Sequence, residues 1–246
     1  MVRWRVRPGL HLAGLGLAPA IVVTSLAIDI LLLGASRDWS ALGGWDERFI
    51  ARTSAFTPSI GLISGIVELL RLGPVATAAG LAVLAITNGG LSEEIGWRGW
   101  ALSSLRGSGR SPLVASLLIG AMWAAWHTSS PVWELVLTRP WREGLDALAV
   151  IVLQYTLLTV PLAVIYTVLV EAAVGSLLVA VLLHASYNLT INLAASAWPG
   201  FPMITMLVLI WLVAIALTLT RRLWRAEPAP APTPGPTRPG RSSARD

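Results

Sequence analysis

The chain has 246 residues, of which 55% are hydrophobic and only 13% are charged, and its mean hydropathy is +0.70. This balance excludes an ordinary water-soluble domain, and the lack of cysteine excludes disulfides and thiolate chemistry. The net charge of +5 comes from arginines at the ends of apolar runs, so lipid headgroups rather than nucleic acid are the expected partner. The composition predicts an all-α, polytopic transmembrane helical bundle.

Apolar runs long enough to cross a bilayer, about 20 residues each, predict about six membrane helices, within a range of about six to eight. The first run follows basic residues as a signal peptide would, but it is long for one and no clear cleavage site follows, so we expect it to be retained. The predicted spans are residues 10–34, 74–105, 112–135, 147–170, 173–197 and 202–220. A weaker apolar segment at 53–70 is either a further, weak span or an interfacial or re-entrant helix.

Charged connections are predicted at 35–52 and 138–146, where paired charges and tryptophans suit the headgroup level. Residues 226–246 alternate proline with small residues, which predicts a disordered cytoplasmic tail after a transmembrane domain at 1–225. Arginine clusters at both ends place both termini in the cytoplasm, so the number of crossings is even, which favours about six. All the basic residues are arginines, a bias typical of high-GC bacteria, so a bacterial cytoplasmic membrane is the expected location.

Ionisable side chains are costly at membrane depth, about 2.5–3.5 kcal/mol each on insertion scales, and they indicate function by default. The segment 74–105 contains Glu93, Glu94 and Arg98, and two of the three histidines, His127 and His184, lie in later apolar runs. We therefore expect three separate segments to converge on one hydrolytic site.

Helical spacing supports this convergence, because residues four apart share a helix face. The pairs so related are Glu94 with Arg98, Trp123 with His127, and His184 with Asn188. Simpler explanations exist for each feature alone: a helix ion pair, a helix start capped by Ser92, or histidines that only bond between helices. Their coincidence within apolar segments favours a shared site. Asn88-Gly89-Gly90 is then expected to distort the helix beside a water-filled cavity.

Here the sequence resembles the CPBP family of intramembrane proteases, which includes the CAAX prenyl endopeptidases and the bacterial Abi-type proteins. The first motif of that family, Glu-Glu-x-x-x-Arg, matches Glu93, Glu94 and Arg98. The matched core covers approximately residues 75–195. Each motif is short, and the specificity comes from their order within membrane helices.

The other two motifs lie on later segments. The second, Phe-x-x-x-His, matches at His127, with Trp123 in place of the phenylalanine. The third, His-x-x-x-Asn, matches His184 and Asn188. The tryptophan is the one departure from the family pattern.

The resemblance implies an intramembrane endopeptidase that acts on membrane-associated or lipidated peptides or proteins. Glu93 would be the general base and would activate water together with His127. His184 and Asn188 would donate hydrogen bonds to the oxyanion of the tetrahedral intermediate, one such donor being worth about 2.7–4 kcal/mol. The remaining matched residues would hold the catalytic frame without transferring protons: Glu94, Arg98 and Trp123.

Two alternatives concern the cofactor. Glutamate-type chemistry needs none, and the absence of a His-Glu-x-x-His helix favours it. Alternatively, Glu93, His127 and His184 would present three ligands to Zn²⁺ and leave one position for water.

Two other functions use the same residues. A non-catalytic membrane protein, such as a bacteriocin immunity factor or a scaffold, would keep the fold without turnover. A proton-coupled transporter would use the ionisable groups as a relay, but paired broken helices in two related halves would then be expected. The intact set of polar positions favours the enzyme.

We expect the purified, active protein to hold less than about one equivalent of zinc and to keep its peptidase activity in the presence of chelators, because the usual zinc helix is missing. Metal analysis by mass spectrometry, together with activity after chelation, measures this. Activity that is lost on chelation and restored by Zn²⁺ would contradict it.

Overall fold

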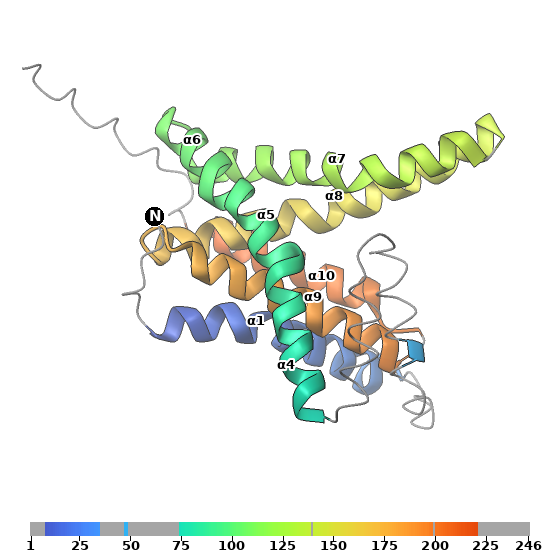
Figure 1. The fold of residues 1–246 in the computed structure, drawn as a ribbon, viewed down its shortest axis with the longest axis horizontal. Helices are drawn as coiled ribbons and strands as arrows, with labels where there is room; N and C mark the ends of the chain where they lie inside the picture. The colour runs from blue at the N-terminus through green and yellow to red at the C-terminus, as the bar shows by residue number, and fades with distance from the viewer. Residues whose placement is uncertain (1–7, 35–46, 49–73, 139, 199, 221–246) are drawn as a thin grey trace, which may run out of the picture.

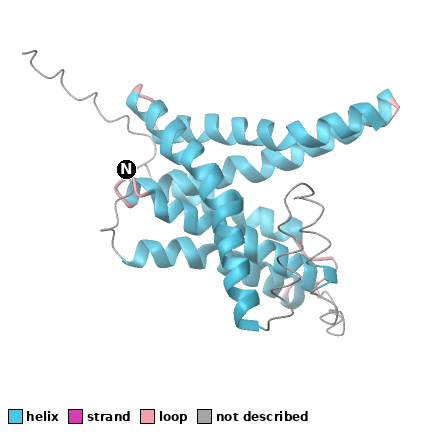
Figure 2. Ribbon diagram, in the orientation of Figure 1, coloured by secondary structure: helices cyan, strands magenta, loops and turns pink. Residues whose placement is uncertain are grey.

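The computed structural model describes residues 8–34, 47–48, 74–138, 140–198 and 200–220. Within this part of the chain the secondary structure is helical, with turns between the helices and no strand (Figure 2). The predicted all-α bundle is confirmed. The predictions for the segment at 53–70, for most of the connection at 35–52 and for the tail at 226–246 lie outside the described residues.

The rod that carries the paired carboxylates is one continuous stretch of helix from α4 to α6, which crosses α9 (Figure 1). It agrees with the single predicted segment at 74–105. In chain order, the helices are α1 (Pro8–Leu31), α4 (Pro74–Ala85), the π-helix η2 (Ile86–Leu91), α5 (Ser92–Glu94), the π-helix η3 (Ile95–Ala101), α6 (Leu102–Gly107), α7 (Pro112–Thr138), α8 (Trp141–Ala172), α9 (Leu177–Ala197) and α10 (Met203–Leu219).

Helix α7 is longer than the sequence predicted. The predicted span ends at 135, but the helix continues through the polar stretch at 128–131 to Thr138. The hydroxyl of Thr128 donates to the carbonyl of Ala124, and that of Ser129 donates to the carbonyl of Trp126. The preceding turn therefore supplies hydrogen-bond acceptors for these hydroxyl groups, and the helix continues without a break.

The connection predicted at 138–146 is wrong over most of its length, because α8 begins at Trp141. Pro140 precedes it with ψ of 141°, an extended conformation that suits the residue before a helix. Glu143 lies in the first turn, where the helix dipole favours a carboxylate. The charged composition that suggested a loop is equally suited to a helix start.

Helices α7 and α8 lie side by side as an antiparallel pair (Figure 1). They come into close contact at Gly120, where a Cβ atom would lie 2.7 Å from the Cα of Val160. The hydroxyl of Thr159 donates across the same crossing to the carbonyl of Gly120, at 2.8 Å. Small residues at such crossings are typical of helix pairs in membranes.

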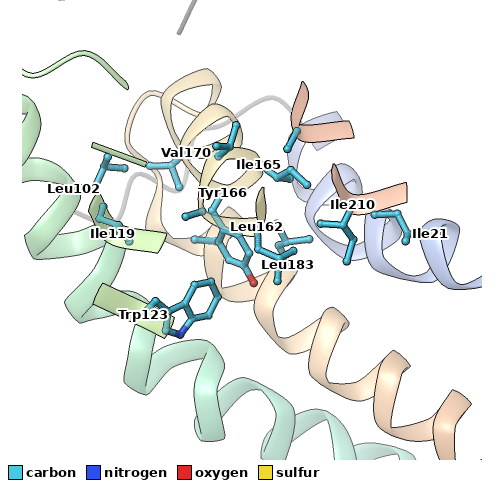
Figure 3. Packing of buried hydrophobic residues seen from close by; sticks show 14 of the residues in the cluster. Ile21, Leu102, Ile119, Trp123, Leu162, Ile165, Tyr166, Val170, Leu183 and Ile210 are labelled. Carbon is cyan, nitrogen blue, oxygen red and sulfur yellow. The ribbon is translucent and has the colours of Figure 1, made fainter. Parts of the chain in front are cut away.

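The buried apolar core joins this pair to α1, α9 and α10. Figure 3 shows the rings of Trp123 and Tyr166 near one another within it, with Leu183 of α9 beside the tyrosine. Among the described helices, α1, α8 and α9 are long and apolar enough to cross a membrane, whereas the apolar α10 is shorter. The total number of crossings and the side on which the termini lie remain predictions.

We expect Gly120→Ala to lower the free energy of unfolding by about 1–3 kcal/mol, because the added methyl group must displace the backbone of α8. The matched control is Gly16→Ala in α1, where a Cβ would meet nothing within 4 Å. Alanine there should stabilise the helix by up to about 1 kcal/mol. Unfolding in detergent, followed by tryptophan fluorescence, compares the two. Equal shifts would contradict the close crossing.

Candidate active site

The rod is wound wider than an α-helix on both sides of the carboxylate pair. The π-helices η2 and η3 flank the short α5, which contains Glu93 and Glu94. Gly89 in η2 has φ of 98°, a conformation that L side chains rarely adopt. The distortion predicted at 88–90 is confirmed. π-Helical turns are rare and occur frequently at functional sites.

Ser92 is the first residue of α5, but it follows η2 without a break and caps no separate helix, so the capping alternative is wrong. The helix runs through it, and its hydroxyl accepts a hydrogen bond from the backbone N–H of Gly89 at 3.0 Å. The hydroxyl thereby satisfies a backbone donor within the distorted turn.

Glu94 is buried and bound from two sides. Its Oε1 accepts a hydrogen bond from Nη1 of Arg98 at 2.9 Å, and both side chains are 0% exposed. Nδ1 of His184 lies 2.7 Å from the same oxygen. The predicted ion pair is present, and His184 extends it from the rod to α9.

The guanidinium of Arg98 lies between two aromatic faces. Its Cζ is 4.0 Å from the ring centroid of Tyr166 on α8 and 4.6 Å from that of Trp123 on α7. Nε and Nη2 of Arg98 have no hydrogen-bond partner among the described residues. Cation–π contacts therefore stabilise the part of the charge that the carboxylate does not reach.

Glu93 faces a different set of groups. Its Oε2 accepts a hydrogen bond from the indole Nε1 of Trp123 at 2.7 Å, and Nε2 of His127 lies 3.9 Å from the same oxygen. The side chains of Glu93 and His127 are 14% and 30% exposed. This pair is thus the accessible part of the cluster, whereas Glu94 is shut off from solvent and lipid.

Two aromatic residues that sequence reasoning missed surround His127. The ring of Tyr155 on α8 stacks on it with centroids 5.0 Å apart and planes within 6°. Trp126 meets it edge to face, also at 5.0 Å. An aromatic in an apolar run looks the same in sequence whether it packs in a core or against a catalytic ring.

Asn188 lies on α9 one turn after His184, and both side chains approach Gly89. A Cβ at Gly89 would lie 2.6 Å from Nδ2 of Asn188 and 3.0 Å from Nε2 of His184. The missing side chain therefore allows the rod to contact the two nitrogen atoms directly. All the residues that the motifs singled out lie within this one region, on the rod, α7 and α9.

The three candidate zinc ligands do not form a ligand cluster. Glu93 and His127 face one another, whereas Nδ1 of His184 contacts Glu94 and its Nε2 approaches Gly89. In the part of the chain that the structure describes, no group of three His, Asp or Glu side chains converges as a metal site.

Comparison with known proteins adds one finding. Residues 75–190 match the family model described as type II CAAX prenyl endopeptidase Rce1-like. This segment is similar to the Rce1-like family. It contains the rod from its second residue onwards, all of α7 and α8, and the part of α9 that bears His184 and Asn188. No curated protein and no solved structure matches the chain.

The match confirms the resemblance seen in the motifs and supports the general fold of a CAAX-type intramembrane endopeptidase. The family match and the apolar helices α1, α8 and α9 together indicate an integral membrane protein. The family match covers the helices that build the cluster around Glu93 and Glu94, whereas α1 and α10 lie outside it.

We expect Arg98→Ala to lower the free energy of unfolding by about 3–5 kcal/mol, since the buried carboxylate of Glu94 would lose the guanidinium of its ion pair. The control is Arg106→Ala, because Arg106 forms a 2.7 Å ion pair with Glu171 whose side chains are 20% and 34% exposed. The free energy of unfolding should fall by at most about 1 kcal/mol in Arg106→Ala. Denaturation in detergent measures both, and equal losses would contradict the burial argument. Adding Glu94→Gln to Arg98→Ala should recover part of the stability.

Proposed function

We propose that the chain is an intramembrane endopeptidase in which Glu93 and His127 activate water against a peptide bond of a membrane-associated or lipidated substrate. The observation that carries the proposal is the different environment of two adjacent carboxylates. Glu94 is buried against Arg98 and His184, whereas Glu93 is partly exposed and faces His127. The similarity of residues 75–190 to the Rce1-like family supports peptide hydrolysis as the reaction.

The spacing between Glu93 and His127 suits a shared water. At 3.9 Å, Oε2 and Nε2 are too far apart for a direct hydrogen bond, but one water about 2.8 Å from each atom can bond to both. As the oxygen of this water attacks the peptide carbonyl carbon, Glu93 takes a proton from the water. His127 orients the water for the attack. The C–N bond then breaks, and the proton on Glu93 passes to the leaving amine.

The negative charge that develops on the carbonyl oxygen needs hydrogen-bond donors. We assign this role to Nδ2 of Asn188 and Nε2 of His184, which both approach Gly89. A histidine ring that donates through Nδ1 to Glu94 can donate through Nε2 as well only when it carries both protons. In this mechanism Glu94 and Arg98 move no proton, and they hold the ring of His184 in its orientation.

We expect Glu93→Gln to abolish peptide cleavage, with a fall in kcat of at least about 100-fold, while the unfolding midpoint stays near that of wild type. Glutamine keeps the shape of the side chain and an oxygen that can accept the Trp123 hydrogen bond, but it cannot take a proton. Glu143→Gln, at an exposed position in the first turn of α8, is the matched control and should remain active.

Comparative peptidomics of membranes from cells that express wild type or Glu93→Gln identifies the substrate, and the purified proteins in detergent are then compared on that peptide. Full activity of Glu93→Gln would contradict the assigned base. Identical peptidomes, with an inactive purified wild type, would favour the non-catalytic alternative.

A further inference from the structure

We propose that Trp123 positions Glu93 for catalysis through the N–H of its indole ring, so that a hydrogen bond donated from α7 sets the direction of the carboxylate. The inference rests on the proposed function of Glu93 as the base. Trp123 is 3% exposed, so it cannot bind substrate and acts through the group that it contacts. It is a positioning residue.

The bond has the geometry of a strong interaction. The indole Nε1 lies 2.7 Å from Oε2 of Glu93, short for a donor to a carboxylate, and it joins α7 to the rod. A carboxylate oxygen has two acceptor directions, and the indole occupies one of them. The second direction is left for the water that Glu93 is proposed to share with His127.

The indole ring has no freedom to turn. One face contacts the guanidinium of Arg98 at 4.6 Å, and the edge-on ring of Tyr166 lies 5.8 Å away between centroids. His184 packs against it as well, at 5.5 Å. Because these neighbours fix the ring plane, they also fix the direction of the N–H. The buried ion pair thereby determines the orientation of the accessible carboxylate through one shared aromatic ring.

The residue type matters here. Phenylalanine, the residue of the family motif at this position, offers the same aromatic face but carries no donor. Trp123→Phe therefore keeps an aromatic ring beside Arg98, but it removes part of the buried ring together with the hydrogen bond to Glu93. An isosteric analogue, benzothienylalanine, replaces the N–H by sulfur and removes the donor without changing the ring size.

We expect both replacements to lower kcat by about ten- to a hundredfold on the peptide identified by peptidomics, with KM within about twofold of wild type. The matched control is Trp211→Phe, because Nε1 of Trp211 donates a bond of similar length, 2.8 Å, to the carbonyl of Leu157, away from the site. It should leave kcat unchanged. A wild-type kcat in both Trp123→Phe and the benzothienylalanine analogue would overturn the proposal. If Trp123→Phe does not fold, the kcat of the analogue alone tests it.

A second measurement needs no substrate. Indole ¹⁵N labelling of the full chain in detergent gives one N–H cross-peak for each of the twelve tryptophans, and the peak that is missing from Trp123→Phe is that of Trp123. It should move upfield in Glu93→Gln, where the acceptor becomes neutral, and stay in place in Glu143→Gln. A peak that does not move in Glu93→Gln overturns the proposal whatever the activity of that variant. A peak that moves while Glu93→Gln stays fully active overturns the base assignment and leaves the hydrogen bond standing.

Discussion

The ion pair between Glu94 and Arg98 determines how the rest of the site is arranged. Burying two charges costs several kcal/mol for each ion unless other groups compensate. Here the compensation comes from three helices at once: His184 of α9 binds the carboxylate, and the rings of Trp123 and Tyr166 cover the guanidinium. The rod is thereby fixed against α7, α8 and α9 by one group of contacts.

This constraint explains why two adjacent glutamates differ in environment. Successive residues on an α-helix point about 100° apart. When Glu94 is buried between α8 and α9, Glu93 must turn towards α7, where Trp123 and His127 lie. The division of labour between the carboxylates is thus a consequence of helix geometry, and it needs no special property of either side chain.

Much of this arrangement could be predicted from the sequence. The four-residue spacing of Glu94 with Arg98 corresponds to a direct contact, and the glycines at 89–90 lie in a distorted turn. What spacing within one segment cannot give is the register between segments. Tyr155 and Tyr166 were missed because their contacts depend on how α8 slides along α7 and the rod, which is decided by the crossing at Gly120. The start of α8 was misplaced because charged residues suit both loops and first helical turns.

The π-helical winding on either side of α5 has a consequence for the length of the rod. A π-turn differs from an α-turn by one residue, so gaining or losing a residue within the rod rotates everything beyond it by about 100°. A deletion between Gly89 and Arg98 would turn the buried pair out of its pocket, whereas Ile95 and Trp100, which are 53% and 73% exposed, can change freely. Related chains should therefore vary in their outward side chains and keep this segment free of insertions and deletions, which an alignment of relatives can refute.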